Sequence, residues 1–211
     1  LYKPSDSRLL FLAKVLSFGM ERQFIKRDTR NQKLIAGGVL SPIVLDYIMD
    51  SEVPKPCRHF LGREEELDEL HTLFEENRHI FLYGIAGIGK SELAKAYAKQ
   101  YRKQYTNILY MEYTGNLYQD IVDMDFIDDP PEISEQERFQ RHNRFLRSLK
   151  SDTLLIIDNF NVTSTQDSCL SVVLKYRCRV LFTTRSQLSE YCSFQLKELK
   201  DIPTLFQLTS V

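Results

Sequence analysis

The sequence predicts an α/β fold in which helices cover both faces of a five-stranded parallel sheet. Short apolar runs alternate with helix-forming stretches between residues 79 and 199, which is typical of parallel strands joined by crossover helices. One run, residues 154–157, contains only Leu and Ile, as expected for a strand that is covered on both faces. The chain has 211 residues, 43% of them hydrophobic and 27% charged, so it can bury the core of one ordinary domain.

The predicted strands share one pattern, a few apolar residues that end at polar residues or glycine. We place them at residues 80–83, 107–112, 154–157, 180–182 and 194–196. Residues 91–105 are rich in Ala, Lys, Leu and Glu and predict a helix, and residues 139–149 predict another. Residues 120–137 contain eight carboxylates and no cation, so we interpret them as a surface excursion that follows a short helix.

The chain divides into four segments. We assign residues 1–50 to a helical N-terminal segment of unknown role, 51–63 to a linker, 64–200 to the main domain and 201–211 to a separate C-terminal segment. Pro54 and Pro56 disfavour helix in the linker. The main domain then opens with a helix that has apolar residues on one side.

The charge balance gives no general reason to expect nucleic acid or membrane as a partner, because 28 basic and 29 acidic residues leave a net charge of −1. Residues 22–33 are a local exception with five basic residues and one acidic, which suit a solvated helix face or a phosphate-contacting patch. The apolar stretch 9–18 is too short and too interrupted to span a bilayer. We therefore expect no membrane partner. The four cysteines have spacings that suit neither zinc nor a disulfide framework, so we expect a cytoplasmic protein.

The strongest signal is a loop that satisfies the pattern G-x-x-x-x-G-K-[ST] between a predicted strand and a predicted helix. It reads Gly84, Ile85, Ala86, Gly87, Ile88, Gly89, Lys90, Ser91, and Glu92 follows it. Such a loop aims successive backbone N–H groups at phosphate oxygens, and the helix that follows adds its positive N-terminal end. We therefore predict that these residues bind the phosphates of a nucleotide.

Two side chains of the loop and one downstream aspartate complete the predicted phosphate site. Lys90 supplies a mobile charge for the β- and γ-phosphates, and the hydroxyl of Ser91 is a ligand for Mg²⁺. Asp158 ends the aliphatic strand, at the edge where α/β sheets bind ligands, and we expect it to hold the same Mg²⁺ through water.

Three further positions are candidates for the hydrolytic step. Asn159 stands where many ATPases carry an acidic residue, and an amide orients water but takes up a proton poorly, which favours slow turnover or a structural switch. Arg185 follows the strand that ends in Thr183 and Thr184, and its guanidinium can contact a γ-phosphate. Either threonine can bind the water or the phosphate, and the sequence leaves that choice open.

Four motifs stand in order along the chain: a Phe-Leu-Gly-Arg-Glu segment at residues 60–64, the phosphate loop, the strand ending at Asp158, and the strand ending at Arg185. Together they resemble the STAND class of signal-transduction ATPases, and most closely its NB-ARC/AP-ATPase branch, over residues 58–205. That branch includes plant resistance proteins, apoptotic protease-activating factors and bacterial regulators and defence proteins.

The resemblance implies several properties. The fold would be a P-loop NTPase of three α/β/α layers with strand order 5-1-4-3-2. Phe60, Leu61 and Arg63 would lie beside the adenine and ribose of ATP or ADP, and residues 201–211 would begin a helical lid. ADP would hold a closed state, ATP would permit homo-oligomerisation, and nucleic acid would bind only through domains outside this sequence.

Two other functions compete with a slow, ATP-hydrolysing switch. An AAA+-like ATPase that acts on DNA would use residues 21–33 or a further domain as its nucleic-acid contact. A small-molecule kinase would need clustered Arg or Lys for a second substrate, and the acidic central stretch of residues 107–149 argues against such a cluster.

Overall fold

The computed structural model describes residues 53–58, 60–124, 126, 129, 132–162 and 166–199. The predicted helical segment 1–50, its basic stretch 22–33 and the predicted start of a lid at 201–211 lie outside the described residues. Within the described ranges, no helix is long and apolar enough to cross a membrane.

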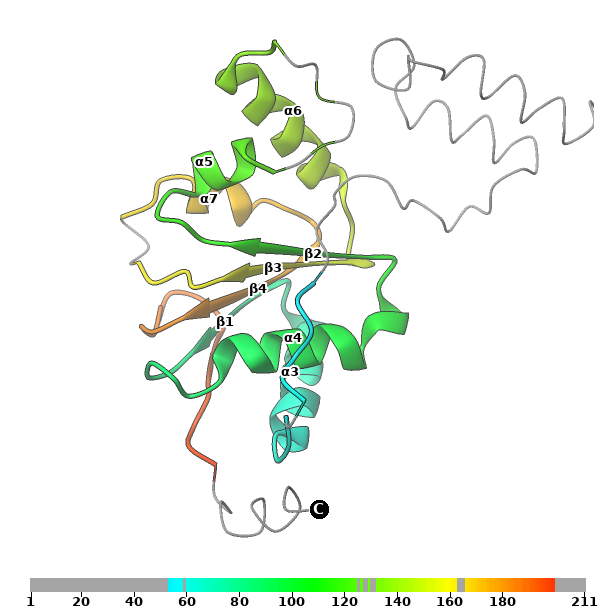
Figure 1. Ribbon diagram of the computed structural model, residues 1–211, viewed down its shortest axis with the longest axis vertical. Coiled ribbons are helices and arrows are strands. Elements are labelled where there is room, and N and C mark those ends of the chain that lie inside the picture. The colour runs from blue at the N-terminus through cyan, green and yellow to red at the C-terminus, as the bar shows by residue number, and fades with distance from the viewer. Residues whose placement is uncertain are drawn as a thin grey trace, which may run out of the picture.

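A five-stranded parallel sheet forms the centre of the domain (Figure 1). Its strands are β1 (His79–Tyr83), β2 (Asn107–Glu112), β3 (Thr153–Asp158), β4 (Arg179–Thr184) and β5 (Ser193–Gln195). They lie in the order β2-β3-β4-β1-β5, and every pairing is parallel. This is the predicted order 5-1-4-3-2 read from the opposite edge, so the predicted fold class is confirmed.

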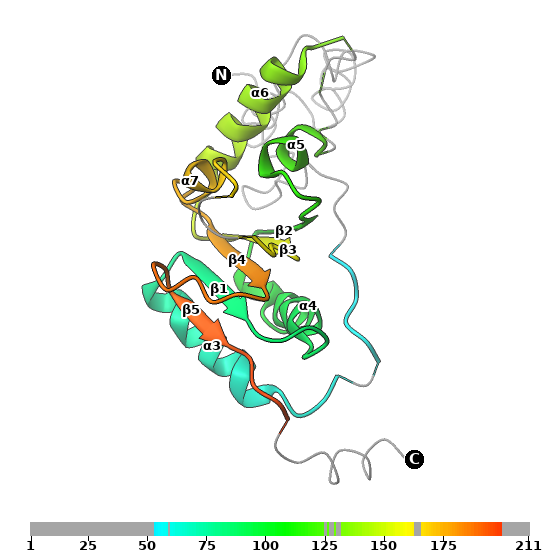
Figure 2. The same ribbon diagram turned by 90° about the vertical axis from the view of Figure 1, so that its left-hand side faces the viewer.

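Helices cover both faces of the sheet, which gives the domain three layers (Figures 1 and 2). Helices α3 (Glu64–Glu76) and α4 (Lys90–Gln100) lie on one face. The other face carries α5 (Leu117–Val122), α6 (Glu135–Ser148) and α7 (Leu170–Val173). Two apolar clusters result, one on each side of the sheet.

Strand β3 supplies both clusters because it lies inside the sheet and all six of its residues are buried. Leu154 and Ile156 pack toward α3 and α4, whereas Leu155 and Ile157 pack toward α5, α6 and α7. This alternation follows from the two-residue period of a strand. It also places Asp158, two residues beyond Ile156, on the α4 face.

The structure corrects two predicted helices. The helix predicted over 91–105 ends at Gln100, and residues Arg102–Gln104 form a short 3-10 turn, η1. Helix α6 begins at Glu135, four residues before the predicted start, because Ser134 caps it: the Ser134 hydroxyl accepts from the Glu137 amide and the Glu137 side chain reaches back to the Ser134 amide.

The stretch 120–137 is not wholly a surface excursion. Asp120 belongs to α5 and is 7% exposed, and its carboxylate accepts hydrogen bonds from the Thr114 amide and hydroxyl. The high number of carboxylates predicted that this stretch is exposed to solvent. A carboxylate that accepts hydrogen bonds within a local turn is nevertheless stable inside the protein. Helix α7 was also not among the predicted elements.

Candidate functional site

The phosphate loop joins β1 to α4 at the carboxyl edge of the sheet, as predicted. Gly89 caps α4 with φ of 100°, a left-handed conformation that glycine adopts without strain. At Gly84, a Cβ atom would lie 2.8 Å from the carbonyl oxygen of Leu196, so the chain after β5 requires glycine there. These two glycines fix where the loop starts and where the helix begins.

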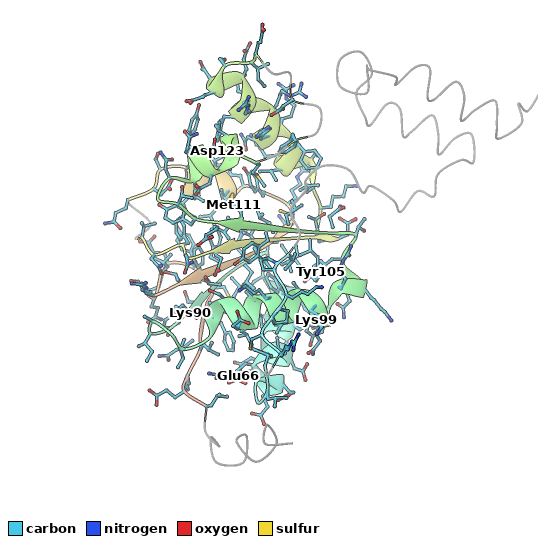
Figure 3. All side chains as sticks on the ribbon, in the orientation of Figure 1. Glu66, Lys90, Lys99, Tyr105, Met111 and Asp123 are labelled. Atoms are coloured by element: carbon cyan, nitrogen blue, oxygen red, sulfur yellow. The ribbon has the colours of Figure 1, made fainter. Side chains whose placement is uncertain are left out.

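Lys90 is the first residue of α4 and is only 9% exposed. Its ammonium donates to the carbonyl oxygens of Gly84 and Ile85, each at 2.9 Å, so it lies along the inside of the loop. Figure 3 shows Lys90 at the end of α4 next to the carboxyl edge, and Lys99 toward the other end of the helix. Burial lowers the pKa of Lys90, the charge of Arg185 lowers it further and Asp158 opposes both.

Asp158 accepts hydrogen bonds from three hydroxyl groups that come from three elements. The Ser91 Oγ donates to its Oδ1 at 2.8 Å, Thr183 donates to the same oxygen, and the Tyr110 hydroxyl donates to Oδ2 at 2.6 Å. The structure thus joins the predicted Mg²⁺ ligands Ser91 and Asp158. Burial and the bond to Asp158 raise the pKa of Tyr110, so this phenol stays protonated and donates.

The two-residue period of β4 decides between the two threonines that the sequence could not separate. Thr183 lies two residues after Leu181, which packs on the α4 face, and its hydroxyl reaches Asp158. Thr184 is fully buried, and its hydroxyl accepts from the Ser186 amide at 3.3 Å. Thr183 is therefore the threonine that contacts Asp158, and Thr184 contacts the turn after β4.

Asn159 and Arg185 follow β3 and β4 at the same edge, and both are exposed. Asn159 has φ of 62°, and its backbone amide donates to the Thr183 hydroxyl at 2.9 Å. The Arg185 amide donates to the Asn161 side chain at 2.9 Å, which ties the loop after β4 to the loop after β3. The Asn159 side chain also contacts Glu112, with its Nδ2 3.4 Å from Oε1.

Arg63 is buried and links three parts of the domain. Its guanidinium donates to the Glu66 carboxylate at 2.6 Å, to the Lys197 carbonyl at 2.7 Å and to the Ile88 carbonyl at 3.3 Å. The predicted adenine-side segment therefore touches the phosphate loop. Phe60 packs against the core on the α4 side, and Leu61 remains 37% exposed.

Residues 59–171 match the AAA ATPase domain family, which is more than half of the chain. The chain belongs to the AAA ATPase domain family. The match spans the arginine segment, the phosphate loop and Asp158, so the P-loop NTPase identity predicted from the motifs is confirmed at this level. It does not identify the STAND or NB-ARC subtype.

Solved structures similar to this AAA ATPase domain include Cdc6p from Pyrobaculum aerophilum, at 16% identity and a TM-score of 0.44, over 70% of this chain and 47% of that one. A DNA replication initiation factor aligns at 13% identity and a TM-score of 0.44, over 70% of this chain and 51% of that one. The chain thus spans about half the length of these structures. No curated protein matches the sequence.

In this AAA ATPase domain, Glu92 lies beside the loop but has other partners. Its carboxylate accepts from the Cys57 amide at 2.6 Å and from the Lys95 ammonium at 2.9 Å. Although burial acts to raise it, these two contacts hold the pKa of Glu92 below its usual value. Glu92 therefore attaches the segment before Phe60 to α4.

The donor set of the AAA ATPase domain suits Mg²⁺. A serine hydroxyl and a carboxylate are hard oxygen ligands, and Mg²⁺ in nucleotide sites takes one or two protein oxygens together with phosphates and water. Ser91 and Asp158 would hold Mg²⁺ together with a nucleotide. Among the described residues, no group of three or more His, Cys, Asp or Glu could hold a metal ion.

Sequence reasoning missed two residues of β2 that contact predicted site residues: Tyr110 donates to Asp158, and Glu112 contacts Asn159. They lie two residues apart, on the strand face that looks toward α4. The signal was present, because a polar side chain ending a parallel strand beside β3 reaches the same edge as Asp158. This signal could be recognised only once the strand order had shown that β2 lies beside β3.

Proposed function

We propose that this chain is the ATP-binding core of an AAA-type ATPase that binds ATP or ADP with Mg²⁺ and hydrolyses ATP slowly. The observation that carries the proposal is the contact between the Ser91 hydroxyl and the Asp158 carboxylate at 2.8 Å, next to a phosphate loop lined by the Lys90 ammonium. A hydroxyl, a carboxylate and an ammonium meeting at a helix N-terminus match the charges of a magnesium–nucleotide complex.

Each residue has a distinct role in the proposal. The loop from Gly84 to Gly89 presents its backbone amides to the phosphates, and Lys90 neutralises the β- and γ-phosphates. Mg²⁺, when bound, neutralises the charge that develops on the transferred phosphoryl group. Arg185 contacts the γ-phosphate, which lets the site distinguish ATP from ADP. The proximity of Arg185 to Lys90 supports this role, since its charge lowers the lysine pKa.

The wider function of the protein is a separate part of the proposal. The family match agrees better with an AAA-type ATPase, for which we propose DNA as the target, than with an NB-ARC regulator. One observation favours a nucleotide switch: Arg63 connects the phosphate loop at Ile88 to the chain leaving β5 at Lys197. Through Arg63, a change of the bound phosphates would alter the position of the chain that follows Lys197. That chain would in turn alter a contact between copies of the protein in a homo-oligomer.

Replacing the lysine of the phosphate loop tests nucleotide binding. Isothermal titration of MgATP and MgADP should give affinities about 10- to 100-fold lower for Lys90→Ala, since a hydrogen bond to a charged group is worth about 1.5–3 kcal/mol. Lys99→Ala is the matched control, a lysine of the same helix that is exposed and distant from the loop. MgGTP should bind more weakly than MgATP. Equal affinities for parent and Lys90→Ala, or no binding by the parent, would contradict the proposal.

Duplex DNA separates the two wider functions. If the protein acts on DNA, duplex DNA should bind and change the ATP turnover, and both effects should weaken as salt rises because binding releases counterions. A signalling switch should hydrolyse ATP at the same rate with and without DNA. The measurement is phosphate release at two salt concentrations, with Lys90→Ala as the blank.

A further inference from the structure

Strand β2 brings a carboxylate to the phosphate site that no motif of the loop contains. Glu112 is the last residue of β2 and pairs in register with Asp158, the last residue of β3. Its side chain is exposed at the carboxyl edge, and its Oε1 lies 3.4 Å from the Nδ2 of Asn159. Glu112 also lies close enough to Tyr110, which donates to Asp158, for its charge to raise the pKa of that tyrosine.

The other groups at this edge are unsuited to take a proton from water. Asn159 carries an amide, which has no basic atom at neutral pH. Asp158 is 3% exposed and already accepts from three hydroxyls. Glu92 is occupied by the Cys57 amide and the Lys95 ammonium. Of these three carboxylates, Glu112 alone is exposed, and the side-chain amide of Asn159 contacts it.

We propose that Glu112 is the catalytic base of ATP hydrolysis and that Asn159 is its positioning residue. The inference rests on the proposed ATPase function. In the step, the water oxygen forms a bond to the γ-phosphorus while the bond from that phosphorus to the β,γ-bridging oxygen breaks and its electron pair leaves with ADP. The proton of the water passes to the Glu112 carboxylate and then to solvent, so the products are ADP, phosphate and a proton.

The backbone at Asn159 explains how the pair is held. Asn159 sits in the left-handed region with φ of 62°, a conformation that Asn tolerates better than most residues. The backbone amide of Asn159 donates to the Thr183 hydroxyl, which itself donates to Asp158. The side-chain amide is thereby presented to Glu112 from a rigid turn. In this proposal the Asn159 amide orients the base, whereas the sequence analysis expected it to orient water, and the neighbouring strand β2 supplies the base.

The test separates ATP affinity from the rate of the chemical step. In single-turnover phosphate release, Glu112→Gln should lower the rate about 100- to 10,000-fold, the range for loss of a general base, with ATP affinity unchanged. Glu75→Gln, an exposed carboxylate of α3, is the matched control and should keep the parental rate. Asn159→Ala should lower the rate by a smaller factor, and adding it to Glu112→Gln should cause no further loss, because the two act as one unit.

The outcomes are distinct. A Glu112→Gln variant that hydrolyses ATP at the parental rate overturns the inference and leaves nucleotide binding intact. A parent that binds MgATP without hydrolysing it also overturns the inference. Full additivity of the two substitutions removes the positioning role of Asn159. Failure of the parent to bind MgATP instead contradicts the proposed function itself.

Discussion

Asp158 is the residue on which the site converges. It ends a strand whose six residues are all buried, so its carboxylate loses water when the chain folds. Hydrogen bonds from Ser91, Thr183 and Tyr110 replace that water. The carboxylate is thereby held at a fixed place beside the phosphate loop, which is what an outer ligand of Mg²⁺ requires.

The two threonines of β4 give a paired test of this arrangement. Thr183→Val removes a hydroxyl that donates to Asp158 and accepts from Asn159, so we expect it to lower the free energy of unfolding by about 1.5–3 kcal/mol, the value for hydrogen bonds to charged groups. Thr184→Val removes one neutral bond, worth about 0.5–1.5 kcal/mol. Urea denaturation measures both, and a larger loss for Thr184→Val would contradict the assignment of Thr183 to the site.

At the scale of elements, β2 and α5 are joined by a turn that buries charge. Asp120 in α5 accepts from the amide and hydroxyl of Thr114, just beyond the end of β2. Asp167 similarly accepts from the Leu117 amide and the Tyr113 hydroxyl. The two carboxylates fix the path of the chain as it leaves Glu112, so the position of the proposed base depends on them.

Burial of Asp120 makes the stability of this region depend on pH. Burial raises the pKa of Asp120 above its ordinary value of 3.8, the Thr114 contacts act against that rise, and Asp167 adds to it. The folded protein then binds the proton more tightly than the unfolded chain, so stability falls as pH rises from about 4 through the folded pKa. Asp120→Asn should flatten this fall in urea unfolding measured between pH 4 and 7.

The control for that measurement is Asp152→Asn, an exposed carboxylate in the turn before β3. It should leave the pH dependence of unfolding close to that of the parent. A pH dependence that Asp120→Asn leaves equally steep would show that the burial of Asp120 is not its source.

At the scale of the whole molecule, Arg63 joins segments that are far apart in the sequence. It connects the start of α3 to the phosphate loop and to the chain after β5, which lie 25 and 134 residues away. A single buried guanidinium can do this because its planar fork donates in several directions at once. The nucleotide site and the exit of the domain are thereby held by one side chain.

Removing this guanidinium should loosen both ends of the connection. Arg63→Ala should lower the free energy of unfolding by about 3–5 kcal/mol, since it leaves the partly buried Glu66 carboxylate without its cation. Arg63→Lys should restore only part of this free energy of unfolding, because one ammonium group cannot donate in the several directions of the planar guanidinium. Hydrogen exchange should become faster in both variants at residues 84–91 and near Lys197. Faster exchange at only one of the two places would contradict the linking role.

By itself, the sequence determined the strands, their approximate bounds and the phosphate loop. Local patterns suffice for these, because an apolar run of four residues at 154–157 is typical of a buried strand, and the glycine and lysine spacing of residues 84–91 is typical of a phosphate loop. The same local reasoning placed Ser91 and Asp158 at one edge once a parallel sheet was expected.

Only the tertiary structure decided which neighbours complete the site. Thr183 was separated from Thr184 by the register and pleat of β4, and Tyr110 and Glu112 entered because β2 lies beside β3. The pairing of strands and the face that each side chain takes depend on contacts between residues about 50 positions apart, such as the 48 that separate Tyr110 from Asp158. No local pattern carries that information, because the free energy that selects it comes from packing the whole sheet.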